Sequence, residues 1–101
     1  MSDVIGIAWY KDEDTYRRAL EVFTDSQNMP ATFEDWKAIV GKQVELIKDT
    51  GNSAIRADID PEIFVAWCAS RGIVADSWGR TAFVRHVEIE YLKTGKATFI
   101  E

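Results

Sequence analysis

The fold is decided at residues 53–69, which read SAIRADIDPEIFVAWCA. Asp60 can accept hydrogen bonds from the free N–H groups at the start of a helix. Pro61 suits the first helical position, and Glu62 favours the positive end of the helix dipole. One apolar run ends just before these three residues and another begins just after them. A strand therefore leads directly into a helix at this point.

The same junction occurs near the start of the chain. Residues 4–10, VIGIAWY, run into Lys11-Asp12-Glu13-Asp14. The first segment is rich in the residues that favour strands, so we predict a buried strand over 4–10. The helix that follows should end near Asp25, and its apolar stripe has helical spacing. That stripe comprises Tyr16, Ala19, Leu20 and Phe23.

The middle of the chain predicts a second helix and a second strand. Thr32 is the expected N-cap of the helix, with Asp35 three residues later, and Gly51 is the expected stop. Its apolar face comprises Trp36, Ile39, Val40, Val44 and Ile47. Residues 53–59 then alternate between a charged face and an apolar face, which predicts a half-exposed strand. The two faces are Ala54, Arg56, Asp58 and Ile55, Ala57, Ile59.

The helix that Asp60 begins is apolar on nearly every side over residues 63–69. A helix of this composition is expected to be buried by several neighbours. Trp67 should then lie in the core.

Two structures are compatible with the last third of the chain. In the first, Ser77 caps a helix that runs to about Lys93 and is closed by Gly95. Its apolar residues would form two opposite stripes, namely Trp78, Ala82, Ile89, Leu92 and Phe83, Val84, Val87, Tyr91. In the second, residues 84–100 form a β-hairpin, because 87–91 alternates with period two. We favour the helix, since residues 80–86 carry no strand signal.

Together these elements predict one α/β domain over residues 1–101, with α+β as the alternative class. The predicted order is β-α-α-β-α-α, with a two-stranded sheet covered by helices. Two strands are too few for a stable sheet unless helices cover them or a second chain extends them. An uncovered strand edge and the two-striped last helix both favour a homodimer.

Composition narrows the classes of partner. The 101 residues are 47% apolar, and 17 acidic residues oppose 12 basic ones for a net charge of −5. Such a surface disfavours nucleic acid and anionic membranes as partners. Cys68 is the only cysteine, and the first residues do not resemble a signal peptide, so we expect a cytoplasmic protein.

No pattern of catalytic or metal-binding residues emerges. Cys68 and His86 are the only residues of their kinds, but Cys68 lies in an apolar run where burial makes a thiol inert. We therefore interpret them as a packed cysteine and an unrelated polar or structural histidine. One Cys and one His leave a zinc site incomplete, and no glycine-rich phosphate loop is present. We predict no catalytic residues, no metal and no cofactor.

The strand ends are the best candidate for a ligand site, because ligands of open α/β sheets gather at the carboxyl ends of the strands. Trp9, Tyr10, Arg56 and Asp58 occur there. If the two strands are parallel neighbours, these residues line a small pocket. A ligand-binding protein or small enzyme would use Asp58 as a base and Arg56 as an anion anchor.

Our leading hypothesis is a small, non-catalytic binding or regulatory protein that acts through an aromatic-rich surface. Its partner is a second copy of itself or another protein, and the strand-end pocket makes a small molecule the first alternative. The second alternative is a DNA-binding helix-turn-helix over residues 64–87, in which Arg80 and Arg85 contact DNA. The overall acidity and the long connection between its helices disfavour this alternative.

Overall fold

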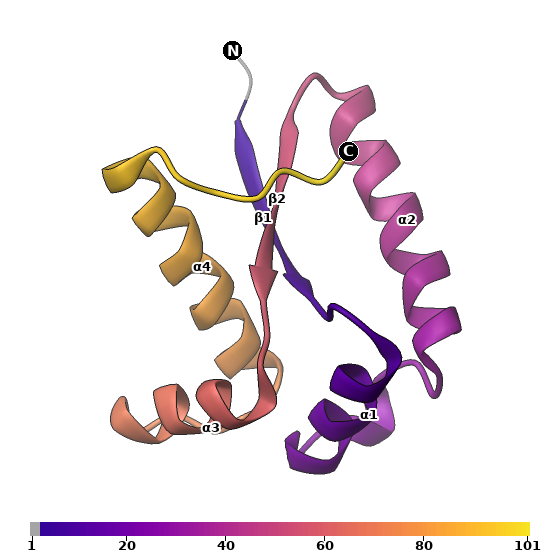
Figure 1. Ribbon diagram of the computed structural model, residues 1–101, viewed down its shortest axis with the longest axis vertical. Helices are drawn as coiled ribbons and strands as arrows, with labels where there is room; N and C mark the ends of the chain where they lie inside the picture. The colour runs from indigo at the N-terminus through magenta and orange to yellow at the C-terminus, as the bar shows by residue number, and fades with distance from the viewer. Residues whose placement is uncertain (1–2) are drawn as a thin grey trace.

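The chain follows the predicted order of strands and helices (Figure 1). The computed structural model describes residues 3–101. It contains β1 (Val4–Trp9), α1 (Glu13–Val22), a 3-10 turn (Ser26–Asn28), α2 (Phe33–Asp49), β2 (Ser53–Asp58), α3 (Pro61–Ser70) and α4 (Ser77–Thr94). The predicted α/β class and the single two-stranded sheet are confirmed for these residues.

The sheet is a parallel pair with α2 and α4 on opposite sides of it (Figure 1). Its register runs from Val4 beside Ser53 to Trp9 beside Asp58. The bare face of Gly6 meets α4, where a Cβ would come within 2.8 Å of Val84 Cγ1. Trp9 points to the other side, and its ring centroid lies 5.2 Å from that of Trp36 in α2. The two helices flank the sheet across the plane of Figure 1, and the molecule measures 19 Å along its shortest axis, which is the direction of view.

Side-chain caps start the four helices, as the sequence predicts for three of them. Asp60 accepts hydrogen bonds from the N–H groups of Glu62 and Ile63, at 3.1 and 3.2 Å. Asp12 and Thr32 cap α1 and α2 in the same way. The prediction for α4 is wrong by one residue, because the cap is Asp76 and not Ser77. The Asp76 carboxylate accepts from the Gly79 N–H, which is the third N–H of the helix.

The predicted alternative of a hairpin over 84–100 is wrong. Helix α4 continues to Thr94 and ends at Gly95, whose φ of 71° is the left-handed conformation that glycine favours. The residues after it then cross β2 (Figure 1). The Arg56 N–H donates to the Thr98 carbonyl, and the Ile100 N–H donates to the Ala54 carbonyl, both at 2.8 Å.

The segment after Gly95, residues 96–101, is the C-terminal tail, and it changes how β2 is buried. The sequence predicts one exposed face, yet Ala54 is buried as completely as Ile55 and Ala57. The prediction fails at Ala54 because the C-terminal tail and α2 both pack against this strand. Conversely, β1 is predicted to be buried and is half-buried along its whole length. Its outer edge borders an open cleft.

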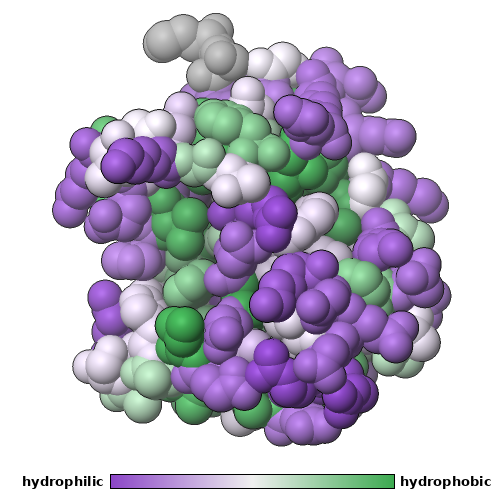
Figure 2. Space-filling model, viewed as in Figure 1, coloured by the Kyte–Doolittle hydropathy of each residue, from purple (hydrophilic) through white to green (hydrophobic). Residues whose placement is uncertain are grey.

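Helix α3 is the largest departure from the predicted burial. Phe64 and Cys68 are buried, but Ile63 is 64% exposed and Ala66 and Ala69 are also exposed. The helix lies at one end of the molecule, beside α4, so only one side of it meets the core (Figure 1). Trp67 is accordingly half-buried. Figure 2 shows the consequence, since green apolar patches interrupt the polar surface over α3 and α4.

The core lies beyond the carboxyl ends of the strands, where aromatic rings pack edge to face. Tyr10 is 5.0 Å from both Tyr16 and Trp36 between ring centroids, and Phe64 is 5.6 Å from Phe23. These contacts join the end of β1 to α1, α2 and α3. Within the part of the chain that the structure describes, no helix has the length and apolar content to cross a membrane.

Candidate functional site

The structure brings together three of the four residues predicted to line a strand-end pocket. The Arg56 guanidinium lies 2.7 Å from the Asp58 carboxylate and 5.4 Å from the centroid of the Trp9 ring. They border a hollow of about 250 Å³. Its other lining residues are Lys11, Thr15, Ile59 and Asp60. Within the hollow, the Arg56 guanidinium is already paired with the Asp58 carboxylate.

Tyr10 does not line this pocket. Successive residues of an extended chain point to opposite sides, so Tyr10 turns away from Trp9 and into the aromatic core. It is 1% exposed. Its edge borders a second and larger cleft instead.

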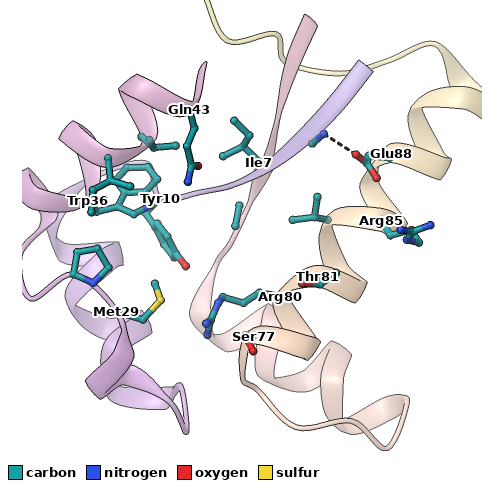
Figure 3. A pocket seen from close by; sticks show the side chains of 16 residues that line it. Ile7, Tyr10, Met29, Trp36, Gln43, Ser77, Arg80, Thr81, Arg85 and Glu88 are labelled. Atoms are coloured by element: carbon teal, nitrogen blue, oxygen red, sulfur yellow. Dashed lines mark hydrogen bonds between the residues drawn. The ribbon is translucent and has the colours of Figure 1, made fainter. Parts of the chain in front are cut away.

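The second cleft, of about 560 Å³, opens along the outer edge of β1 (Figure 3). Gly6, Ile7 and Ala8 form its floor. Helix α2 forms one wall with Trp36, Ile39, Val40 and Gln43, and α4 forms the other with Ser77, Arg80, Thr81, Val84, Arg85 and Glu88. We call this site the edge cleft. Its mouth faces away from the C-terminal tail, which crosses the opposite strand.

The backbone at the floor of the edge cleft is only partly paired. At the two ends of the ladder, the carbonyls of Asp3 and Trp9 accept hydrogen bonds from residues that flank or belong to β2. Because a parallel ladder alternates, the N–H groups of Gly6 and Ala8 face away from β2. The Gly6 N–H donates to Glu88 Oε2 at 2.7 Å. No partner for the Ala8 N–H occurs among residues 3–101.

An ion pair and an unpartnered hydroxyl lie at the end of the edge cleft near α3. The Arg80 guanidinium donates twice to the Asp25 carboxylate, at 2.9 Å each, and lies 4.6 Å from the centroid of Phe23. These hydrogen bonds from Arg80 hold the pKa of Asp25 below its ordinary value. The Tyr10 hydroxyl is buried without a hydrogen-bond partner in the described part of the chain. Burial raises the pKa of Tyr10, so the phenol stays neutral at physiological pH.

No family model, curated protein or solved structure matches this chain. Only the geometry of its own sites therefore bears on function. Residues 3–101 contain no cluster of three or more His, Cys, Asp or Glu side chains placed to hold a metal ion.

Cys68 and His86 do not form a nucleophile pair. Cys68 is 2% exposed, and burial raises the pKa of its thiol. The His86 ring instead packs against Trp67, with 5.7 Å between the ring centroids. Cys68 is therefore buried, and the His86 side chain is half-buried against α3.

The sequence drew attention to Arg80 and Arg85 for a different reason, as DNA contacts. Arg80 is only 13% exposed at its side chain and is neutralised by Asp25, so it is not free to reach a phosphate. Six residues, 71–76, separate α3 from α4, which is longer than the turn of a helix-turn-helix. The edge cleft itself was missed, because no sequence pattern shows that α2 and α4 flank the same strand edge.

Proposed function

We propose that this protein is a small, non-catalytic binding protein that holds a segment of a partner protein in the edge cleft. The observation that carries this proposal is the cleft itself. Its volume of about 560 Å³ falls within the range typical of ligand sites, which is about 300–1,000 Å³. Such sites combine apolar walls with a few polar groups that orient the ligand.

The chemistry of the lining favours binding over catalysis. Trp36, Ile39 and Val40 supply an apolar wall, while Gln43 and Thr81 supply an amide and a hydroxyl. One of the charged lining residues, Arg80, is already neutralised by Asp25. An elongated cleft between two helices, with strand backbone as its floor, suits an extended chain.

A random peptide library displayed on phage tests this proposal. We expect enriched peptides, once synthesised, to shift the backbone amide resonances of Ile7, Ala8 and Gln43 in ¹⁵N-labelled protein. Thr81→Trp should abolish binding, because an indole at this exposed position of α4 would fill the cleft. Glu90→Trp is the matched control, since it adds the same ring at an exposed position that does not line the cleft, and it should bind normally.

Two outcomes of this titration would contradict the proposal. One is that no displayed peptide binds. The other is that the shifts gather at Lys11, Arg56 and Asp58, which would favour the alternative of a small-ligand protein or enzyme that uses the strand-end pocket. The buried Thr15 hydroxyl, which has no partner among residues 3–101, is the feature that supports this alternative.

The homodimer is a separate prediction that now depends on the outer face of α4. Trp78 is 80% exposed, Leu92 79% and Ile89 44%, and exposed apolar stripes of this kind mark interfaces. We expect size-exclusion chromatography with light scattering to give a dimer at micromolar concentration. The double variant Trp78→Ser, Leu92→Ser should elute as a monomer. A monomeric wild-type protein would contradict the prediction.

We also expect the protein to act in the cytoplasm. Its only cysteine, Cys68, is buried and free, which suits a reducing compartment.

A further inference from the structure

We infer that the partner segment binds as a third, extended strand beside β1, in the same plane as the sheet. This inference rests on the proposed function and specifies the partner. The N–H of Ala8 is a free donor on the floor of the edge cleft, and Gly6 satisfies its own donor with a side chain. A strand edge with such groups is a template for another extended chain.

The opposite edge of the sheet shows how this protein completes a strand. There the C-terminal tail lies antiparallel to β2, and two hydrogen bonds join it to Ala54 and Arg56. Two outward backbone groups of β2, the Ala54 carbonyl and the Arg56 N–H, are thereby paired. No segment of residues 3–101 pairs in this way with the outward backbone groups of β1.

The size of the edge cleft matches a short strand. Strands lie about 4.8 Å apart, sheets pack about 10 Å apart and each residue rises about 3.3 Å, so a residue in a covered strand occupies about 160 Å³. The volume of about 560 Å³ therefore holds three to four residues. The edge is also recessed between α2 and α4 (Figure 3). A single extended segment can reach this edge. The β1 edge of a second copy cannot, because it is recessed between its own α2 and α4.

The two walls specify the side chains of this segment. Alternate residues of a strand point to opposite faces. One set would meet the apolar wall of Trp36, Ile39 and Val40, and the other set would meet α4. On α4, the exposed Arg85 has no salt-bridge partner among residues 3–101, and Glu88 lines the same wall with the opposite charge. The segment is therefore an alternating peptide, with apolar side chains toward α2 and polar side chains toward Arg85 and Glu88 on α4.

Glu88 is the internal substitute for this peptide. Its carboxylate accepts the hydrogen bond from the Gly6 N–H that a peptide carbonyl would otherwise accept. Binding therefore requires Glu88 to leave Gly6, and Glu88 competes with the partner.

The probe is the peptide acetyl-Val-Glu-Ile-Glu-Val-amide, titrated by isothermal calorimetry against the full chain. Ala8→Pro removes the outward N–H at a position where an edge strand tolerates proline, and should weaken binding about tenfold or more. Ala8→Gly keeps the N–H and is the matched control, with an affinity close to that of the wild type.

Glu88→Ala should have the opposite effect and tighten binding about three- to tenfold, because it removes the competitor for Gly6. Glu90→Ala removes the same charge from the exposed side of α4 and should change the affinity little. If Ala8→Pro does not fold, amide exchange gives the answer instead. The peptide should slow exchange of the Ala8 N–H in the wild-type protein.

Equal affinities for Ala8→Pro and Ala8→Gly, or unchanged exchange at Ala8, would overturn the strand inference. If library peptides still bound the edge cleft in that case, the proposed function would stand without it. If no peptide bound the cleft at all, both would fall.

Discussion

Replacing Phe64 with alanine will lower the free energy of unfolding by about 3–5 kcal/mol. Phe64 is 0% exposed, and its ring packs edge to face against Phe23 and Phe83, at 5.6 and 5.7 Å between centroids. The variant therefore loses buried area and leaves a cavity that these rings cannot close. The total free energy of unfolding of such a domain is about 5–15 kcal/mol, so this substitution removes a large part of it. Urea denaturation, monitored by circular dichroism, measures the loss in the free energy of unfolding.

Ile63→Ala is the matched control on the same helix. Ile63 precedes Phe64 in the sequence and is equally apolar, but it is 64% exposed. Its truncation should cost no more than about 0.5 kcal/mol. Similar losses for the two variants would mean that α3 is buried on all sides, as its composition suggests.

Gly79→Ala will destabilise the protein by about 2–4 kcal/mol, although alanine normally favours helices. A Cβ at this position would overlap the backbone carbonyl oxygen of Val74 and come within 3.2 Å of Cys68 Sγ. A backbone atom cannot turn aside as a side chain can. The start of α4 would have to move away from the connection at Val74 and from α3, which also disturbs the Arg80–Asp25 ion pair one residue later.

Gly41→Ala provides the control for the same substitution in a helix. No atom lies within 4 Å of a Cβ built at Gly41, on the exposed side of α2. Alanine there should raise the free energy of unfolding by about 0.5–1 kcal/mol. Thermal unfolding of both variants gives the comparison, and a stabilised Gly79→Ala would show that α3 and α4 do not pack this closely.

The sequence predicts the elements well because their boundaries depend on neighbouring residues. Asp60, Pro61 and Glu62 start α3 through contacts within one helical turn, and Gly95 ends α4 through its own φ angle. The strand-end pocket was also predictable in part. Trp9, Arg56 and Asp58 meet because parallel strands bring their carboxyl ends to one edge, and Tyr10 departs because side chains alternate.

The burial of individual side chains and the position of the edge cleft were not predictable from neighbouring residues. The apolar residues of α3 read alike along the sequence, yet Phe64 is enclosed and Ile63 is open to solvent. Likewise Glu88 contacts Gly6 across 82 positions of chain.

The sequence by itself therefore determined the order of the strands and helices, their positions to within a few residues and the caps of α1, α2 and α3, because those interactions are local. The tertiary structure alone decided that the tail covers β2, that α2 and α4 leave the outer edge of β1 accessible, and that Ile63 and Val65 of α3 are exposed. These features depend on how distant segments share a limited surface, since a helix can bury only the faces that its neighbours reach.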